Sequence, residues 1–445
     1  MKITAVEAIP FAIPYLKPLR FASGEVHAAT HVLVRVHTDA GVVGVAEAPP
    51  RPFTYGETQD GIIAVIKGIF APAVVGLTLL EREVVAARVA RTVGNPAAKS
   101  AVDMAIWDAL GKVLGLPVGD MLGGYTDRMR VSHMLGFAEP AAMVAEAEKM
   151  VDIYGIRTFK VKVGRHPASL DTAVVRALRE RFGSDVELYV DGNRGWTAAE
   201  SARAMREMAD LDLLFAEELC DAADVLGRRW LVEQLPVPFI ADESVPTPAD
   251  VTREILGRSA TAVSIKTARS GFTTSRRTHH LAEGLGVPVV MGNQIDGQIG
   301  TACTLAFGSA FELTSRYAGE LSNFLDMSDD LLTEPLQIRD GHLHRSTAPG
   351  IGFEIDPDKL DGSVRDYLSA LADLAAPDAF DAALRGFRAG ERVLVDPALA
   401  AERIVELIEE GGASVVLKPD PARLPRARKN DIEIAGSRAA HLRDG

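Results

Sequence analysis

The chain is poor in cysteine and carries no excess of positive charge, and each shortage excludes a class of protein. Its 445 residues include only two cysteines, Cys220 and Cys303, too few for a disulfide framework, so a reducing compartment is expected. Lys and Arg number 48 against 61 Asp and Glu, a net charge of −13, which argues against a nucleic acid or a membrane surface as partner. No run reaches the roughly 18 uncharged apolar residues of a membrane span, and the N-terminus has no signal-peptide core. A multidomain cytoplasmic protein is expected.

The first part of the chain, residues 1 to about 125, has the pattern of an α+β domain. Strand-like alternation comes first and helical spacing follows it. The expected strands are 2–13, 31–38 and 42–48, and the expected helices are 61–70, 80–91 and 97–114. Two segments without periodicity, 20–30 and 49–58, are interpreted as loops, which often carry function.

From about residue 130 to 326, short apolar runs alternate with longer amphipathic ones. The expected strands are 131–135, 158–163, 187–193, 213–219, 238–244, 262–268, 288–294 and 321–325. Helices such as 169–182 and 198–209 lie between them, and Thr197 with Glu200 has the pattern of a capping box. These repeated units predict the α/β class, with a parallel (β/α) barrel favoured over a doubly wound sheet.

The last part of the chain, residues 361–445, is rich in alanine and differs from the rest. Segments 391–396, 397–410 and 413–418 have the patterns of a strand, a helix and a strand. Two strands and one helix bury too little surface to fold stably alone. We interpret this region as a βαβ-like appendage of uncertain role.

Charged residues fall near the C-terminal ends of successive expected strands. They are Lys162, Asp191, Glu217, Asp242, Lys266 and Asp296, separated by 29, 26, 25, 24 and 30 residues. Each separation is close to one strand–helix unit, and consecutive barrel strands end side by side at one mouth. One such residue alone is more often a cap or a surface charge, but the joint pattern predicts convergence on one pocket.

Side-chain alternation refines this expectation. In the acidic pairs 217–218 and 242–243 only one member of each should point inward. Glu217 and Asp242 are favoured because they stay in phase with the apolar residues two positions earlier.

Three carboxylates in one concave site repel one another unless a cation compensates them. Oxygen donors without His or Cys indicate a hard divalent ion, Mg²⁺ before Mn²⁺, held by Asp191, Glu217 and Asp242. Lys162 and Lys266 would flank the ion on opposite sides, with the depressed pKa values that a catalytic base needs. This arrangement suits proton transfer at the carbon next to a carboxylate, so a small carboxylate substrate is expected.

Several other side chains are weaker candidates for the substrate pocket. Lys160 and Asn193 each lie two positions from a strong candidate and so face the same side, while the others belong to the expected loop 49–58, end the expected strand 288–294 or follow it. These candidates are Phe53, Tyr55, Lys160, Asn193, Asn293, Gln294 and Asp296.

The motifs of residues 1–360 resemble those of the enolase superfamily, in its muconate-lactonizing subgroup. The matching motifs are K-V-K at 160–162, D-G-N at 191–193, A-E-E at 216–218, A-D-E-S at 241–244 and S-I-K at 264–266. The resemblance implies a capping domain, residues 1–125, over a modified (β/α)₇β TIM-like barrel, residues 126–339. Segment 340–360 would return to the cap, with a strand near 349–355.

The resemblance also implies an activity: a Mg²⁺-dependent interconversion of cis,cis-muconate and muconolactone in aromatic catabolism. Asp191, Glu217 and Asp242 would bind the ion, while Lys162 and Lys266 would act as acid and base. Lys160 would tune Lys162 or touch the substrate carboxylate. We also expect a homo-oligomer.

Two residues depart from the family pattern, and the motifs admit other functions. Leu219 stands where the family usually has Pro, and Asp296 replaces a Glu. The same site could serve an N-acylamino-acid racemase, a dipeptide epimerase or an o-succinylbenzoate synthase, and a catalytically idle scaffold is the third alternative. The motif alone cannot separate them, because a racemase needs both lysines and a cycloisomerase needs one.

The C-terminal segment 423–445, RLPRARKNDIEIAGSRAAHLRDG, resembles the junction segment of aminopeptidase P, a creatinase-like enzyme. The chain contains none of the metal ligands of that family's catalytic domain. Peptidase activity is therefore not implied, and we interpret the tail as a fused remnant.

Overall fold

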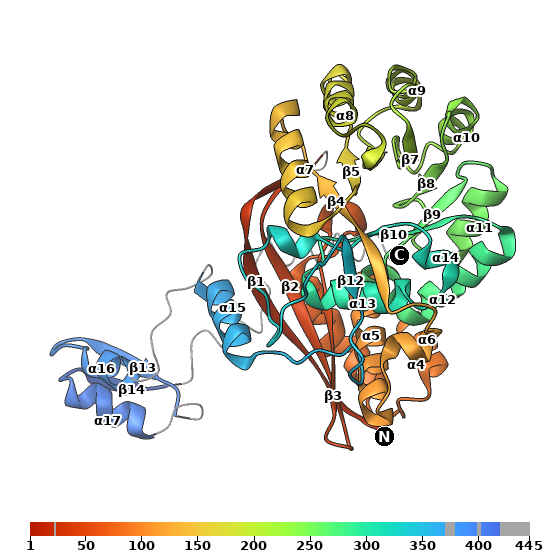
Figure 1. Ribbon diagram of the computed structural model, residues 1–445. Coiled ribbons are helices and arrows are strands. Elements are labelled where there is room, and N and C mark those ends of the chain that lie inside the picture. Colours follow the sequence, from red (N-terminus) through yellow and green to blue (C-terminus); the bar gives the residue numbers. More distant parts are fainter. Residues whose placement is uncertain (22–23, 370–378, 398–401, 419–445) are drawn as a thin grey trace. The chain divides into compact units, whose positions relative to one another are not determined.

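The computed structural model describes residues 1–21, 24–369, 379–397 and 402–418 (Figure 1). The chain divides into two compact units, Met1–Leu368 and Ser369–Gly445. The first unit contains the residues that the sequence analysis singled out for catalysis and metal binding, and the two units are described separately.

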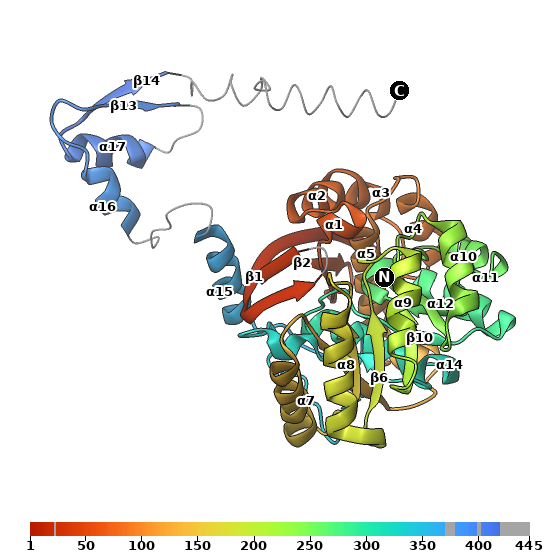
Figure 2. The ribbon, with the colours of Figure 1, turned by 90° about the horizontal axis from the view of Figure 1, so that it is seen from above.

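An antiparallel sheet of three strands opens the first unit. Its strands β1 (Ile3–Phe21), β2 (Gly24–Thr38) and β3 (Val43–Ala48) lie in sequence order, and β1 and β2 form the long hairpin seen from above in Figure 2. The prediction of a loop over 20–30 was wrong for the described residues 20–21 and 24–30, which belong to the two strands, with Leu19 opposite Val26. Backbone hydrogen bonds from the partner strand stabilise this segment, and the local sequence pattern does not predict them.

The capping helices follow this sheet. They are α1 (Pro52–Tyr55), α2 (Gln59–Val65), the π-helix η1 (Ile66–Phe70), α3 (Ala71–Val74), α4 (Arg82–Val89), α5 (Pro96–Leu114) and α6 (Val118–Leu122). The three expected helices are present, and the expected loop 49–58 contains the single turn α1. Strand β3 lies directly on α5, since a Cβ at Gly44 would come within 2.0 Å of the Ala105 carbonyl oxygen.

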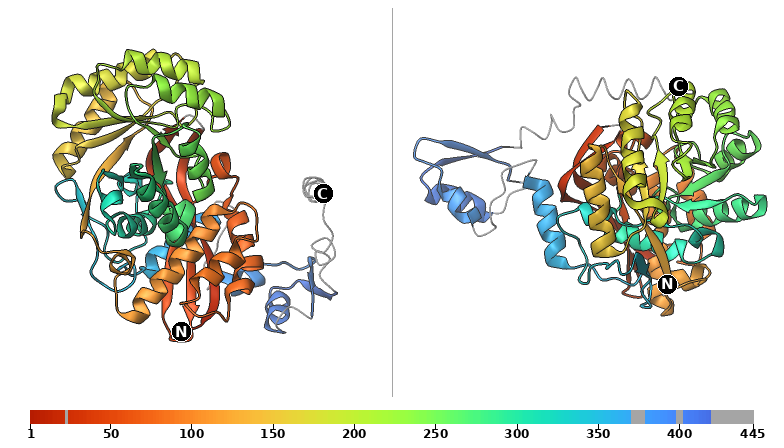
Figure 3. Two further views of the ribbon diagram at one scale, coloured as in Figure 1. Left: turned by 90° about the vertical axis from the view of Figure 1, so that its right-hand side faces the viewer. Right: turned by 45° about the horizontal axis from the view of Figure 1, so that its top comes forward.

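The barrel consists of seven strand–helix pairs and a final strand. Figures 1 and 3 show the helices of these pairs on the outside of the strands. The pairs are β4 (Arg128–Leu135) with α7 (Pro140–Tyr154), β5 (Thr158–Lys162) with α8 (Ser169–Phe182), β6 (Glu187–Asp191) with α9 (Ala198–Glu207), β7 (Leu213–Glu217) with α10 (Val225–Gln234), β8 (Phe239–Ala241) with α11 (Pro248–Leu256), β9 (Ala262–Ile265) with α12 (Thr267–Leu285), and β10 (Val289–Met291) with α13 (Gln298–Gly308). The final strand β11 (Gly319–Glu320) pairs in parallel with β4. The predicted (β/α)₇β barrel under a capping domain is therefore confirmed.

Local signals for the barrel helices were accurate. Helix α8 has the predicted bounds. The hydroxyl of Thr197 accepts from the Glu200 N–H at the start of α9, and Glu200 Oε2 accepts from the Thr197 N–H at 2.8 Å, which completes the capping box.

Two expected strands are not found as predicted. The strand expected at 321–325 is shifted to β11, after which the Ser322 hydroxyl donates to the Ser132 carbonyl at 3.2 Å and the chain turns into the 3₁₀-helix η3 (Asn323–Asp326). The returning strand expected at 349–355 is reduced to single bridges, with Gly350 beside Pro117 and Ile355 beside Leu332. An antiparallel strand β12 (His342–His344) pairs with β4 instead. In both places tertiary contacts replace the ladder that the apolar pattern suggested.

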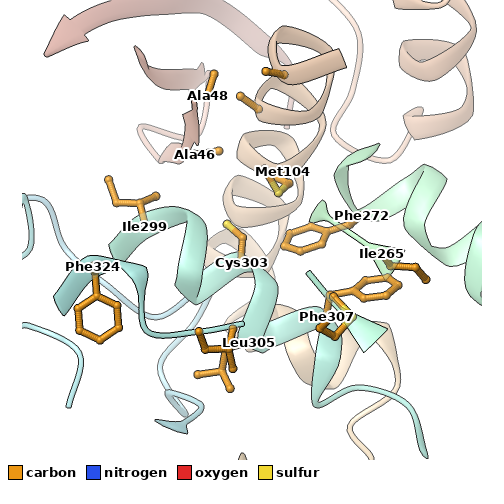
Figure 4. Close-up of a cluster of buried hydrophobic side chains, with 14 of the residues drawn as sticks. Ala46, Ala48, Met104, Ile265, Phe272, Ile299, Cys303, Leu305, Phe307 and Phe324 are labelled. Carbon is orange, nitrogen blue, oxygen red and sulfur yellow. The ribbon is translucent and has the colours of Figure 1, made fainter. Parts of the chain in front are cut away.

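Cap and barrel share one hydrophobic core. Figure 4 shows side chains of β3, α5, α12 and α13 pointing toward one another in this core. Among those labelled are Ala46, Ala48, Met104, Phe272, Ile299, Cys303 and Phe307. The shared core holds the capping strands against the helix that follows β10.

The second unit contains α16 (Phe380–Arg385), β13 (Arg392–Val395), α17 (Glu402–Glu410) and β14 (Ser414–Leu417). Strands β13 and β14 are parallel, so the predicted strand–helix–strand order is confirmed. Val395, Ile408 and Ala413 form its small core. The aminopeptidase-like segment 423–445 lies outside the described residues. Within the described ranges, no helix is long and apolar enough to cross a membrane.

Candidate active site

Three strands bring charged side chains into one row at the C-terminal edge of the barrel sheet. The register places Lys162 opposite Asp191, and Asp191 opposite Glu217. Each is the last residue of its strand, β5, β6 or β7. Because neighbouring parallel strands end at one edge, these side chains share a layer of the barrel.

Asp242 and Lys266 extend this row. They follow β8 and β9 directly, and the Nζ of Lys266 contacts the carboxylate of Asp242. Glu217 is fully buried between Asp191 and Asp242, and burial together with these two charges raises its pKa well above the usual range, although Lys160 opposes the rise. The strand-end charges therefore converge, as their spacing indicates.

Lys160 lies among the carboxylates. Its Nζ is 2.8 Å from Glu217 Oε1 and 2.9 Å from Asp191 Oδ2. A third carboxylate, Glu320 of β11, lies 2.6 Å away. Burial opposes the charged form, but the three carboxylates outweigh it and raise the pKa of Lys160 well above its usual value. Lys160 therefore compensates part of the buried negative charge through direct contacts with three carboxylates.

Lys162 and Lys266 contact the cluster through different carboxylates. Lys162 Nζ lies 2.6 Å from both Asp191 Oδ2 and Asn193 Oδ1, while Lys266 contacts Asp242. The expectation of a depressed lysine pKa was wrong for Lys266. Burial lowers its pKa, but the Asp242 carboxylate beside it produces a net rise.

The two acidic pairs behave differently. Glu218 points away from the row toward Arg228 of α10 and the Ser244 hydroxyl, so Glu217 alone faces the cluster. Glu243, in contrast, lines the same cavity as the lysines and accepts from Asn193 Nδ2 at 3.1 Å. The expectation that only one of 242 and 243 points inward was wrong, because β8 ends at Ala241 and strict alternation ends with it. Burial and the neighbouring carboxylates raise the pKa of Glu243 to about 7.

The donor set of Asp191, Glu217 and Asp242 fits a hard divalent cation. All three carboxylates are fully buried, and Glu217 Oε2 makes no hydrogen bond to any residue that the structure describes. A buried carboxylate oxygen without a donor is costly unless a cation approaches it. Among the described residues, two other groups have possible ligand atoms within 4.8 Å of one another. One group is His279, His280 and Glu283, and the other is His133, Glu146 and Asp326. Both ring nitrogens of His133 have partners, Ser322 Oγ at 2.9 Å and Glu146 Oε1 at 3.3 Å.

A cavity of about 40 Å³ opens among these side chains. Its barrel wall carries both flanking lysines, and the cap closes it from above with Arg51, Thr54 and Tyr55. The Tyr55 hydroxyl accepts from Arg269 at 2.9 Å, and the same guanidinium lies 3.0 Å from Asp242 Oδ1. The cap is thereby tied to the carboxylate cluster.

The weaker candidates divide between this cavity and other places. Asn293 and Gln294 line the cavity. Asp296 lies behind them, buried, with Asn293 Nδ2 donating to it at 3.2 Å, and burial raises its pKa to about 8. Phe53 is 74% exposed and lines a different cavity beside the cap hairpin.

Three residues of the site were missed by the sequence analysis. Glu243 was set aside by the alternation argument, and Arg269 lies three residues after Lys266, beyond the S-I-K motif. Glu320 follows Asp296 by 24 residues, one strand–helix unit later. The expected strand was placed one residue too late to include it.

Two family models match the chain. Residues 5–123 match the mandelate racemase / muconate lactonizing enzyme N-terminal domain, and residues 142–359 match the enolase C-terminal domain-like family. Neither match extends into the last 86 residues, 360–445.

Individual relatives cover the same region. Muconate cycloisomerase 1 of Pseudomonas putida is 32% identical over 366 residues, 80% of this chain and 97% of that protein. An L-Ala-D/L-Glu epimerase of Bacillus subtilis is 31% identical over 357 residues, 79% of this chain and 97% of that protein. The crystal structure of a muconate lactonizing enzyme from Mycobacterium smegmatis, complexed with muconolactone, has a TM-score of 0.81 and 78% identity, covering 82% of this chain and 99% of that one.

Proposed function

The chain belongs to the mandelate racemase / muconate lactonizing enzyme family of the enolase superfamily, and from this premise we propose that it is a Mg²⁺-dependent muconate cycloisomerase. It would interconvert cis,cis-muconate and muconolactone. The observation that carries the proposal is a small cavity in which two lysines flank a cluster of buried carboxylates. The 78% identity to a muconate lactonizing enzyme supports this substrate over others.

Asp191, Glu217 and Asp242 would hold the divalent ion. Enzymes of this superfamily bind a divalent metal, typically Mg²⁺. When bound, such an ion stabilises the negative charge that develops on a carboxylate whose α-carbon loses a proton. Lys160 would add positive charge to the same cluster, since its Nζ lies 2.8 Å from Glu217 Oε1 and 2.9 Å from Asp191 Oδ2.

The flanking lysines would move the proton. In lactone formation, one carboxylate oxygen of muconate adds to the carbon–carbon double bond, and a lysine ammonium delivers a proton to the carbon next to the other carboxylate. In the reverse direction that lysine removes the proton and the carbon–oxygen bond breaks. Lys162 and Lys266 both line the cavity, so each can reach a substrate held there.

The second candidate function keeps the site and changes the substrate. An N-acylamino-acid racemase, a dipeptide epimerase or an o-succinylbenzoate synthase would use the same residues, and the Bacillus subtilis epimerase supports this alternative. The position of a lysine on each flank suits removal of a proton from one face and return to the other. Nothing favours an idle scaffold, since every carboxylate and lysine of the cluster is present.

A substrate screen tests the proposal. Purified protein with Mg²⁺ is incubated with cis,cis-muconate, muconolactone, N-acylamino acids and dipeptides, and products are followed by proton NMR. Turnover of muconate with kcat/KM well above that of the other compounds is expected. Efficient racemisation or epimerisation with no lactone formation would overturn the substrate assignment.

A further inference from the structure

A buried carboxylate joins the capping sheet to the barrel at a distance from the charged cluster. Glu47 of β3 is 1% exposed. Its Oε1 accepts from the Gly297 N–H and its Oε2 from the Gly300 N–H, both at 2.9 Å. These amides belong to the N-cap residue and the first turn of α13, so a carboxylate of the capping domain accepts hydrogen bonds from the start of this helix. A Cβ at Gly297 would lie 2.9 Å from Glu47 Oε1, so any other residue there would have to displace the carboxylate.

His31 of the neighbouring strand β2 holds this carboxylate. Its Nδ1 contacts Glu47 Oε1, and its ring is 1% exposed. Its other nitrogen, Nε2, is buried and has no hydrogen-bond partner in the described part of the chain. Because an ionised carboxylate only accepts hydrogen bonds, Nδ1 carries a proton and donates it in a hydrogen bond to Glu47. The backbone of His31 is fixed in turn, because Gln59 Nε2 donates to its carbonyl at 2.6 Å.

The segment just before α13 needs such support. Ile295 has a φ of +59°, in the left-handed region that β-branched residues rarely occupy. Such a conformation persists only where its surroundings enforce it. Ile295 lines the cavity together with Asn293 and Gln294, and Gly297 is two residues further along. The hydrogen bonds to Glu47 thus hold a strained stretch that forms part of the cavity wall.

We propose that His31 is a positioning residue for substrate binding. By orienting the Glu47 carboxylate it fixes the start of α13, keeps Ile295 in the left-handed conformation, and so places Asn293 and Gln294 at the cavity wall. The proposal rests on the proposed function to the extent that the substrate binds in this cavity. It does not depend on which carboxylate is the substrate.

The test compares His31→Leu, which removes the donor, with His31→Asn, whose side-chain amide can replace the Nδ1 donor. His37→Leu is the matched control, because His37 lies on the same strand and pairs with Glu7 at 2.8 Å. Hydrogen exchange of the Gly297 and Gly300 amides is measured without substrate, and KM and kcat are measured with the substrate that the screen identifies. His31→Leu should speed exchange at both amides and raise KM, each by about tenfold, with kcat little changed. His31→Asn should restore most of both effects, and His37→Leu should show neither.

Two outcomes would overturn the proposal. One is unchanged exchange at Gly297 and Gly300 in His31→Leu. The other is a lower melting temperature with unchanged KM, which would make His31 a structural residue only. If His31→Leu does not fold, Glu47→Gln provides the same comparison, since its amide nitrogen would face one of the two backbone donors. If the wild-type protein turned over no substrate in the screen, the proposed function would fail, whereas the substrate-free exchange experiment would still decide the role of His31.

Discussion

Lys160 and Lys162 lie on one face of one strand, two residues apart, yet their surroundings differ. Lys160 contacts Asp191, Glu217 and Glu320 and is 1% exposed. Lys162 ends the strand beside Asp191 and Asn193. The deeper lysine contacts three carboxylates, whereas the shallower one contacts a single carboxylate and an amide and lines the cavity.

We therefore predict that Lys160→Met lowers the free energy of unfolding by more than the loss of side-chain packing alone would. It removes the cation shared by three buried carboxylates, and breaking such a buried pair costs about 3–5 kcal/mol of unfolding free energy. Urea unfolding in chelator-treated buffer measures the loss. Lys162→Met is the control and should lose less stability but more turnover. Equal losses of stability in the two variants would contradict the distinction.

The division of labour between the flanking lysines can be tested by isotope exchange. If the enzyme is a cycloisomerase, only one of Lys162→Ala and Lys266→Ala should abolish exchange of the muconolactone proton next to the free carboxylate with solvent deuterium, because one base moves that proton. Proton NMR in deuterium oxide follows the exchange. Abolition in both variants would favour the racemase or epimerase alternative.

The metal assignment predicts a strong effect of Asp191→Asn. The change keeps the shape of the side chain but removes one ligand charge, and it should cost at least the roughly 10–100-fold in activity typical of groups that support a metal site. Turnover is titrated against Mg²⁺ after chelation. Glu187→Gln, at the other end of β6, is the control and should behave as wild type. Full activity of Asp191→Asn in chelator-treated buffer would refute the assignment.

At the scale of elements, helix α10 is fastened to the barrel by one buried guanidinium. Arg228 contacts Glu218 after β7 and Glu254 of α11, and it donates to the Ser244 hydroxyl at 2.8 Å. Glu218 also accepts from the Asp242 N–H at 2.7 Å. This network fixes the loops after β7 and β8, which carry Glu217 and Asp242.

We predict that Arg228→Met lowers the free energy of unfolding by about 3–5 kcal/mol, because it leaves Glu218 and Glu254 buried without their partner. The neighbouring Arg229 is exposed on the same helix, so Arg229→Met is a matched control that should stay within about 0.5 kcal/mol of wild type. Chemical unfolding of the three proteins gives the comparison. Similar stability of both variants would show that the network contributes little.

At the scale of the whole molecule, the first unit carries the complete candidate site. Helix α15 (Pro357–Ser369) belongs mainly to this unit, since Leu360 is buried in its core and Val364 packs against that core. The second unit has a core of its own that is far smaller. A truncation that removes only the second unit should therefore end the chain at residue 368 rather than at residue 360.

We predict that truncation after Leu368 leaves kcat and Mg²⁺ dependence close to those of the full chain, because the removed residues include none of the proposed ligands or bases. Steady-state kinetics and thermal unfolding of both chains provide the measurement. A lower melting temperature or a changed oligomer with normal kinetics would assign the second unit a role in stability or assembly. A truncated protein that folds and binds Mg²⁺ but does not turn over substrate would contradict the prediction.

Local sequence patterns determined much of this protein. The alternation of apolar runs with amphipathic ones predicted the barrel, because each strand and each helix buries one face with its own period. The near-constant spacing of Lys162, Asp191, Glu217, Asp242 and Lys266 predicted their convergence, since every unit returns the chain to the same edge of the barrel. The capping box at Thr197 could also be predicted, because all the residues that form it lie within one helical turn.

Only the tertiary structure decided the remaining features. Glu243 faces the cavity because alternation ends where β8 ends, and no local pattern fixes that point to one residue. Glu320 meets Lys160 across 160 residues of chain, and the hairpin of β1 and β2 continues through an aperiodic segment because each strand satisfies the other. Likewise, His31 and Glu47 contact the start of α13 through a fold that brings cap and barrel together. Contacts between distant segments depend on how helices and strands pack against one another. The periodicity of one segment does not specify which other segment it contacts.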